Sequence, residues 1–436
     1  MSTDYVQLEE YSKNPVVVSF ETKVELTEAL LEISKTNETW KKKLGLRNNP
    51  FEVTVLGKSL LLAAKGITGF LKIGKLQVEV VPKFLSTSSK DNKWRIALTR
   101  ALFLTDQENL FDDDYTFSRS SDSLLPDLMA ETFINSVEKG FLFGLPRSYT
   151  ETREALPFYR GTYDSSRFTE HLLKPHLIPC KFDEFTTDNK INQSLMVACY
   201  ELAKTVYSSR LSVRLEQLGN RFNATYLIPN KVELENIVLQ PQYNYLSDAL
   251  QIAKLVFSNK GLEHNEGDLK IKGFLWDSST IFEKLVKLII WTYCLRSKKY
   301  SFTDESTSLM QMASRVTSQG KVLIDTTPDV RILENKQTKF LLDAKYKTWS
   351  KQPKNEDVYQ VMAGSRVTKC PLSALVYPLP EDRNGDTIIY NIKGQGMPKV
   401  ISTIFIDIKK LASEKGLDEI IDKFEKDLNV LSNCYN

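Results

Sequence analysis

The first part of the chain carries short runs of apolar residues, many of them β-branched, separated by Gly, Asn and Pro. Five such runs between residues 15 and 85 have the length and punctuation of β-strands. One stretch among them differs, because its apolar residues recur at the spacing of a helix face: Val24, Leu26, Ala29, Leu30 and Ile33. We therefore expect a β-rich N-terminal domain over residues 1–90, with one helix at about residues 24–35.

The middle of the chain has a different period. Between residue 92 and about residue 265, apolar residues recur at spacings of three and four, as on the buried face of a helix. The clearest segments are LPDLMAETFINSVEKGFLFG, NQSLMVACYELAKTVYSS and YLSDALQIAKLVFSN. The polar, Gly-bearing segment at residues 259–268 then interrupts the pattern. We expect a mainly helical middle region over residues 91–265.

A third pattern begins after residue 271. A strongly apolar helix is expected at about residues 279–298, followed by strands VLID, DVRIL and KFLLDAKY, a helix EDVYQVMAGSRV and a strand SALVYPL. An amphipathic helix is expected at about residues 416–431. Helices alternating with short apolar strands are typical of an α/β domain. The sequence thus predicts a multidomain α/β protein whose last domain covers residues 266–436.

Length and composition agree with several ordinary domains. At roughly 150 residues each, 436 residues suggest two or three domains. Hydrophobic residues make up 42% and charged residues 26%, which is a globular balance. The formal net charge is only +3, whereas a protein that holds DNA by phosphate contacts alone usually has a larger basic excess. For any function on DNA, the basic residues must cluster or a partner must supply much of the DNA-binding affinity.

Cysteine and histidine usage excludes several classes of protein. The five cysteines are scattered, odd in number and without a C-x-x-C pair, which indicates reduced thiols. The histidines, His171, His176 and His264, are dispersed, which argues against a histidine metal site or a Ser-His-Asp hydrolase. The N-terminus is acidic and polar, unlike a signal peptide. No apolar run reaches the ~18 residues of a membrane span. We expect a cytoplasmic protein that binds no membrane.

The candidate chemistry lies on two neighbouring strands of the last domain. Pro328 and Asp329 open one strand, and Asp343-Ala344-Lys345 ends the next, with the polar turn LENKQTK between them. A hairpin places such strands about 5 Å apart. Side chains alternate along a strand, so Asp343 and Lys345 project to the same face. We therefore expect Asp329, Asp343 and Lys345 to meet.

These residue types suit metal-dependent phosphodiester hydrolysis. Two carboxylates, Asp329 and Asp343, can hold Mg²⁺, which prefers oxygen ligands. Lys345 can orient a water and offset charge that develops on the phosphate. A lone D-x-K is more often the solvent end of an ordinary strand. The Pro-Asp at hairpin distance, in this order of strands and helix, favours a catalytic site.

Two further residues are candidates for the same site. Glu283 lies on the preceding helix, where its carboxylate can lean toward the metal, although Thr280 to Glu283 also has the form of a capping box. Gln360 lies on the following helix, three residues after Asp357, and can hydrogen-bond a phosphate or a metal-bound water; the alternative is a polar residue on a helix edge. Lys347 is expected to contact phosphate rather than to act as a catalyst.

One apparent nucleotide-binding motif lacks a residue that the motif requires. Residues 69–75 match G-x-x-x-x-G-K, but Leu76 stands where the Mg²⁺-binding Ser or Thr belongs. The interior of the match is apolar and alternating, as in a hairpin, and no Gly-rich loop opens a helix. We expect no cofactor-binding residues for a nucleotide in this chain.

The order of elements resembles the PD-(D/E)xK nuclease fold. The individual sequence motifs resemble those of the McrC family, the nuclease subunit of McrBC-type, 5-methylcytosine-specific restriction systems. FLWDSSTIFEKLV, TPDVRI, LLDAKYK and EDVYQVMAG resemble that family's helix, its two strands and its D-x-Y-Q helix. Upstream, GFLKIGKLQVEVVPKF, LPFYRGTYD and CKFDEFTTDNKINQSL resemble further family segments. The chain departs from the family at Ser278-Ser279, where Met-Asn is usual, and at Gly161-Thr162, where Gly-Arg is usual.

The resemblance implies that the chain is one subunit of a larger complex. In that family the nuclease subunit docks on a ring of an AAA+ GTPase, stimulates GTP hydrolysis and leaves DNA recognition to the GTPase. It thus implies a type IV-like restriction endonuclease for anti-phage defence, which cuts double-stranded DNA with Mg²⁺ while the partner binds GTP. Residues 1–90 would then be the docking domain. Two alternatives stay open: a free-standing PD-(D/E)xK defence nuclease, and a non-catalytic adaptor that regulates an AAA+ NTPase.

Overall fold

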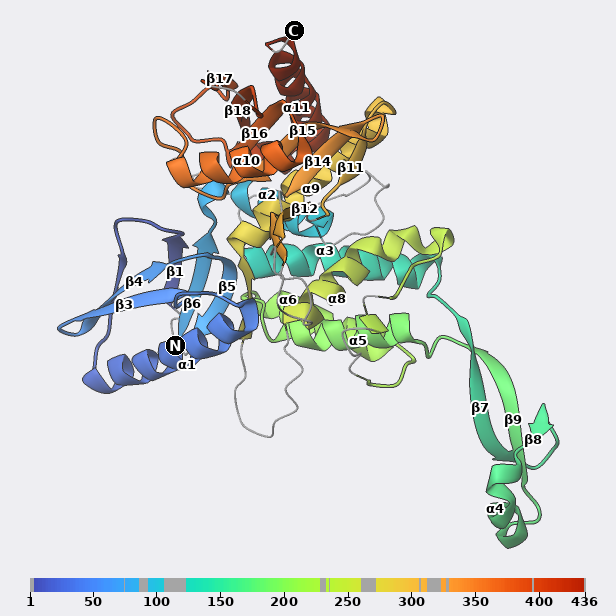
Figure 1. The fold of residues 1–436 in the computed structure, drawn as a ribbon. Coiled ribbons are helices and arrows are strands. Elements are labelled where there is room, and N and C mark those ends of the chain that lie inside the picture. Colours follow the sequence, from blue (N-terminus) through green and yellow to red (C-terminus); the bar gives the residue numbers. More distant parts are fainter. Residues whose placement is uncertain are drawn as a thin grey trace, which may run out of the picture. The chain divides into compact units, whose positions relative to one another are not determined.

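The computed structural model of the chain describes residues 4–73, 75–85, 93–105, 123–227, 233–234, 236–259, 272–305, 307–311, 323–326, 329–393 and 396–434. They form a mixed α/β protein, as expected, with two compact units. One unit combines the described parts of residues 1–115 and 275–436, and the other lies within residues 116–274 (Figure 1). The first unit thus joins the expected first and third domains. The three-domain division itself remains a prediction, and the expected boundary segment lies outside the described residues except for Asn259.

Two small sheets begin the first unit. The strands of the first sheet are β1 Asp4–Glu9, β6 Leu76–Val81, β5 Ile67–Ile73 and β10 Lys272–Asp277, and those of the second are β2 Val16–Ser19, β4 Ser59–Ala64 and β3 Phe51–Leu56. The first sheet has the order β1-β6-β5-β10, with β1 parallel to β6 and β5 antiparallel to β6. The G-x-x-x-x-G-K match therefore lies in the β5–β6 hairpin, as expected, although its second glycine is outside the described residues.

Helix α1 (Lys23–Leu44) lies between β2 and β3 and is longer than the expected segment at residues 24–35. The Thr22 hydroxyl accepts a hydrogen bond from the Glu25 amide at its start, and Gly45 ends it with a φ of +64°. The Asn37 side chain lies buried on the inner face and bonds both backbone groups of Phe51, each at 2.9 Å. These two bonds fix the helix to the start of β3.

A six-stranded sheet forms the second half of this unit. Its strands, in spatial order, are β11 Ser301–Thr303, β14 Val330–Glu334, β15 Gln337–Ala344, β16 Leu372–Pro378, β18 Val400–Ile406 and β17 Ile388–Asn391. The three strands β15, β16 and β18 run parallel. Every residue of β16 and β18 is buried, as in parallel strands covered on both faces.

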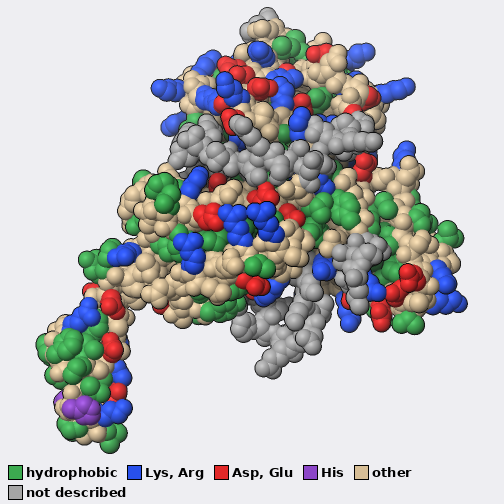
Figure 2. Space-filling view, turned by 180° about the vertical axis from the view of Figure 1, so that it is seen from behind, with side chains coloured by type: hydrophobic (Ala, Val, Ile, Leu, Met, Phe, Trp, Pro, Cys, Tyr) green, Lys and Arg blue, Asp and Glu red, His purple; other side chains and the backbone are tan. Residues whose placement is uncertain are grey.

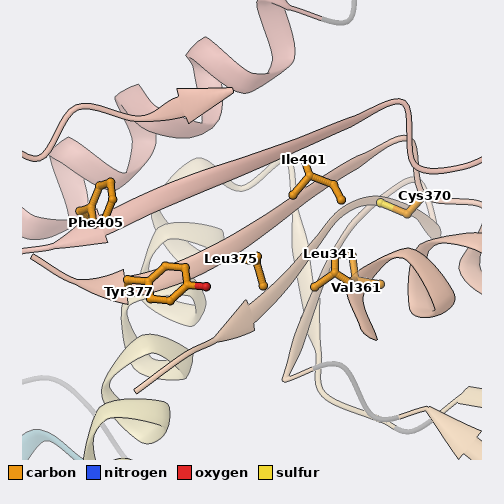
Figure 3. Close-up of a cluster of buried hydrophobic side chains, with 7 residues drawn as sticks. All are labelled: Leu341, Val361, Cys370, Leu375, Tyr377, Ile401 and Phe405. Atoms are coloured by element: carbon orange, nitrogen blue, oxygen red, sulfur yellow. The ribbon is translucent and has the colours of Figure 1, made fainter. Parts of the chain in front are cut away.

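Helices pack against this sheet and against one another. They are α9 Ser278–Ser297, α10 Asn355–Thr368, α11 Gly416–Asn433 and α2 Lys93–Thr105. Helix α10 contacts β15 and β16, α11 contacts β18, and α2 contacts α9. Val361 of α10 reaches the buried side chains of the sheet, among them Leu341, Leu375 and Phe405 (Figure 3). This packing holds the ends of β14 and β15 in place.

The expected strand VLID belongs to another sheet. Its described residues belong to β13 Leu323–Thr326, which pairs with β12 Thr307–Gln311 in a separate two-stranded ladder. Beside β14, the large sheet holds the short β11 instead. The expected helix at residues 279–298 is confirmed as α9, within one residue at each end.

The second unit has a group of helices and a long arm. The helices are α3 Leu125–Phe143, α5 Lys190–Ala203, α6 Ser209–Arg221 and α8 Ser247–Asn259. Between α3 and α5 the chain forms an antiparallel ladder of β7 Ser148–Leu156 with β9 Ile178–Thr186, and β8 Thr162–Tyr163 and α4 Phe168–Leu173 lie near its tip. This arm extends away from the helices of its own unit (Figure 1). A mainly helical region was expected here, so the arm is a difference.

Candidate active site

The β14–β15 hairpin brings Asp329 next to Asp343. Asn335 and Lys336 form its two-residue turn with φ values of 52° and 65°, as the favoured tight hairpin turn requires. Val330 then pairs with Leu342, which places Asp329, one residue earlier, opposite Asp343. One oxygen of Asp329 (Oδ2) accepts a hydrogen bond of 2.6 Å from the Ala344 amide. Pro328 lies outside the described residues.

Lys345 completes the group at the end of β15. Asp343 is only 2% exposed, and the ammonium of Lys345 makes an ion pair with its side chain. The Lys345 amide donates to the Val376 carbonyl at 2.7 Å, so the backbone continues the ladder with β16. The Lys345 ammonium also donates to the Gln360 side-chain oxygen (Oε1) at 2.9 Å. The structure thus brings Asp329, Asp343, Lys345 and Gln360 together.

The two carboxylates disturb each other's protonation. Burial, and then the charge of Asp343, raise the pKa of Asp329 from 3.8 to about 7, against the effect of the Ala344 hydrogen bond. Burial also raises the pKa of Asp343, although the Lys345 ammonium acts in the opposite direction. A cation placed between the two carboxylates would relieve this repulsion.

Asp357 is a member of the site that the sequence did not single out. It lies in the first turn of α10 and is only 3% exposed. Its Oδ1 atom lies 2.6 Å from the Lys347 ammonium and 3.9 Å from that of Lys345. Lys347, expected to contact phosphate, is thus held by a carboxylate. The available signal was the spacing of three residues to Gln360, which puts both on one helix face.

Glu283 lies near the site but does not cap its helix. Helix α9 begins at Ser278, and the Asp277 carboxylate accepts from the amides of Ser279 and Thr280. The capping-box alternative for Glu283 was therefore wrong, because Asp277 is the capping residue. Glu283 lies in the second turn and pairs with Lys287 at 3.1 Å. Its charge contributes to the raised pKa of Asp329, which places it near that carboxylate.

The oxygen ligands fit a hydrated Mg²⁺ ion. Within the described part of the chain, no three Asp, Glu, His or Cys side chains converge closely enough to enclose a metal. Mg²⁺ does not need such a cage, since it keeps several waters and is commonly held by one or two carboxylates. Asp329, which is half-buried, and the buried Asp343 beside it meet that requirement.

The strand end that carries Lys345 is anchored to the N-terminal part of the same unit. The Tyr346 hydroxyl donates to the buried Glu10 carboxylate, just after β1. Glu10 also accepts from the Lys83 amide at 2.9 Å, and the Lys83 ammonium donates to the Tyr346 carbonyl at 3.1 Å. The same ammonium lies 4.2 Å from the centre of the Tyr346 ring, and Phe84 and Phe282 pack around that ring. These contacts fix the backbone next to Lys345.

Fold and site together define a mixed α/β protein with paired carboxylates at the end of a central hairpin. A family model described as the McrBC 5-methylcytosine restriction system component matches residues 62–378, which is more than half of the chain. The chain belongs to this family. No curated protein sequence matches the chain. Among the described residues, no helix is long and apolar enough to cross a membrane.

Two solved structures match the chain, and the first of them has a similar fold. One is described as a refined half-complex from a tetradecameric assembly of Thermococcus gammatolerans McrB AAA+ hexamers with bound McrC. The similarity has a TM-score of 0.60 at 15% identity and covers 95% of this chain and 100% of that one. The other is the cryo-EM structure of the Thermococcus gammatolerans McrBC complex, with a TM-score of 0.49 at 17% identity over 66% of this chain and 88% of that one.

The arm carries an exposed apolar surface that the sequence did not predict. Hydrophobic side chains cover much of it in Figure 2, where it lies at the lower left. Tyr149 and Leu173 are 74% and 78% exposed. Gly161, near the tip, has a φ of +69°, and a Cβ there would lie 2.4 Å from the Lys181 carbonyl oxygen. The glycine is therefore required, while Thr162 beside it is exposed, so the departure from Gly-Arg is accommodated.

Proposed function

We propose that this chain is the Mg²⁺-dependent, DNA-cutting subunit of an McrBC-type restriction complex, with a nuclease centre of the PD-(D/E)xK class. The observation that carries the proposal is the meeting of Asp329 and Asp343 at one hairpin end, with Lys345 paired to Asp343. Membership of the McrBC restriction family supports the reaction class.

Each side chain has a defined task in phosphodiester hydrolysis. Asp329 and Asp343 would hold the metal, which when bound supplies polarisation of the phosphate and a more acidic water. Lys345 lies beside Asp343, where its ammonium orients the attacking water and offsets the charge on the phosphate. Gln360 holds that ammonium at 2.9 Å. Asp357 holds Lys347, which can then present its charge to a neighbouring phosphate.

The proposal includes an AAA+ partner that binds and hydrolyses GTP. The solved structure with the similar fold contains McrB AAA+ hexamers with bound McrC. The low net charge of +3 supports a division of labour in which the partner carries DNA recognition. Docking through residues 1–90 remains a proposal. The arm is a further candidate surface, because exposed apolar patches of this kind mark protein-binding sites.

The decisive test uses the full chain with the AAA+ protein that co-purifies from its host. Asp343→Ala should abolish cleavage of double-stranded DNA in Mg²⁺ and GTP, while stimulation of the partner GTPase persists. The exposed Asp382 offers a matched control, since Asp382→Ala removes a carboxylate that is not among the proposed site residues and should leave both activities intact. Full cleavage by the Asp343 variant would rule out the assigned centre.

The same assay separates the two alternatives. Specific cutting by the purified chain with Mg²⁺ alone, without partner or nucleotide, would identify a free-standing nuclease. GTPase stimulation without cleavage by the unaltered chain in any metal would identify a non-catalytic adaptor.

A further inference from the structure

Helix α6 of the second unit carries a row of basic and polar side chains on one face. Arg210, Arg214, Gln217 and Arg221 follow at spacings of four, three and four residues. At 3.6 residues per turn they fall within an arc of about 60° and extend over about 16 Å. The other face of the helix is buried through Leu211, Leu215 and Leu218. The row is therefore straight and rests on an anchored helix.

This row lines a groove of about 640 Å³ beside helix α3. Glu138 lines the groove together with the three arginines, and both of its carboxylate oxygens lie 2.7 Å from a guanidinium nitrogen (Nη2) of Arg214. The Arg221 guanidinium lies 4.1 Å above the ring of Phe141. Two of the three guanidinium groups thus have a fixed orientation, and Arg210 is exposed. The groove keeps a basic excess after the Glu138 pair is counted.

We infer that this groove binds the phosphate backbone of duplex DNA. Planar guanidinium groups match phosphate oxygens with paired hydrogen bonds, and stacked or paired arginines lose little freedom on binding. DNA carries one phosphate per ~3.4 Å along each strand, so a row of about 16 Å spans several phosphates. The inference rests on the proposed function in taking duplex DNA as the ligand. It also locates a basic cluster in a chain whose net charge is only +3.

An acidic peptide is the competing ligand, and the groove suits it less well. Protein interfaces are centred on buried apolar or aromatic anchors. Of the two apolar residues that line the groove, Val213 is largely exposed and Leu218 is buried. The recognising groups are therefore charges in a row, which fit a regular polyanion.

The test measures binding without cleavage. We would titrate a fluorescent DNA duplex with the full chain in EDTA, from about 50 to 200 mM salt, and compare it with the double variant Arg210→Gln/Arg221→Gln. Loss of two phosphate contacts should weaken binding about tenfold at the lowest salt and make the slope of log K against log salt shallower by about two. Arg214 is left unchanged because its removal would leave Glu138 without this ion pair.

The control removes the same charge elsewhere in the unit. Arg147→Gln/Arg160→Gln changes two exposed arginines that also lie over phenylalanine rings, on the arm, and should leave the salt slope unchanged. Equal binding by the groove variant and the unaltered chain would overturn the inference, as would loss of binding to a poly-glutamate peptide with DNA binding intact. Because this assay measures binding and not cleavage, its result can be interpreted even if the nuclease proposal fails. Circular dichroism checks that both variants are folded.

Discussion

The hydroxyl of Tyr346 donates a hydrogen bond to the buried carboxylate of Glu10, 336 positions away in the chain. Tyr346 directly follows Lys345, so this bond fixes the backbone from which the proposed catalytic ammonium projects. The Lys83 ammonium fixes the same point through the Tyr346 carbonyl and ring. These contacts therefore connect the N-terminal strands directly to the site within the first unit.

Tyr346→Phe should reduce both stability and cleavage. It removes a donor from a buried acceptor, which typically costs about 1–3 kcal/mol, while the ring keeps its packing with Phe84 and Phe282. Urea unfolding and single-turnover cleavage measure the two effects. Tyr359→Phe is the control, because Tyr359 is exposed on α10. Unchanged cleavage with lowered stability would mean that the bond supports the fold without positioning Lys345.

Glu10→Gln should flatten the pH dependence of stability between about pH 5 and pH 8. Burial raises the pKa of Glu10 from 4.5 to about 7. The folded state therefore favours the protonated acid, so the stability from this group is complete below pH 4.5 and is lost as the pH rises through about 7. The shift corresponds to at most about 3 kcal/mol.

The amide oxygen that Glu10→Gln introduces can accept the hydrogen bonds from Tyr346 and Lys83 without carrying charge. Chemical unfolding of both proteins at several pH values measures the difference, which isolates Glu10 from other groups that titrate in this range. Glu9→Gln, at an exposed neighbour, should show the slope of the unaltered chain. Parallel pH curves for Glu10→Gln and the unaltered chain would contradict the prediction.

Asp329→Asn should stabilise the metal-free protein at pH 8 and remove its response to Mg²⁺. The pKa of Asp329 is raised to about 7, so stability is lost as the pH rises through that value, and an amide avoids this loss. Its oxygen still accepts from the Ala344 amide. Thermal unfolding with and without saturating Mg²⁺ measures both effects. If Mg²⁺ stabilises the variant as much as the unaltered chain, Asp329 is not a ligand.

Asp357→Asn should slow cleavage about tenfold at unchanged Mg²⁺ dependence, in the range seen for residues that support a catalytic group. The substitution removes the charge of Asp357, so the Lys347 ammonium, 2.6 Å away, is no longer held by an ion pair. Single-turnover rates across a Mg²⁺ titration measure the change. Glu356→Gln alters the exposed neighbour and should have no effect. A shifted Mg²⁺ midpoint for Asp357→Asn would instead make Asp357 part of the metal site.

The parts of the site that could be predicted depend on local geometry. Asp329 and Asp343 lie on strands joined by one tight turn, so alternation and hairpin pairing suffice to bring them together. Asp357 could not be assigned in this way. In the sequence it is an ordinary acidic residue in the first turn of a helix, and only the packing of α10 against the sheet brings it to Lys347.

One helix was predicted too short and the arm was not predicted, each for a physical reason. Helix α1 continues past Ile33 because Asn37 and Trp40 extend the row of buried side chains on its inner face. A polar Asn is not expected in such a row, and its burial is explained only by its hydrogen bonds to Phe51. Strand β7 of the arm has no buried side chain, so it lacks the alternation by which a half-buried strand is recognised. The pairing of β1 with β6 and the grouping of two units depend on contacts distant in sequence.

The distance in sequence between Glu10 and Tyr346 has a consequence during synthesis. The early strands leave the ribosome long before the hairpin that bears Asp343, and strand β18, which pairs with β16, follows only at residues 400–406. A nascent or prematurely terminated chain therefore lacks part of the sheet that supports the proposed nuclease centre. If the proposed function holds, such fragments would not cut the DNA of the host before the whole molecule is finished.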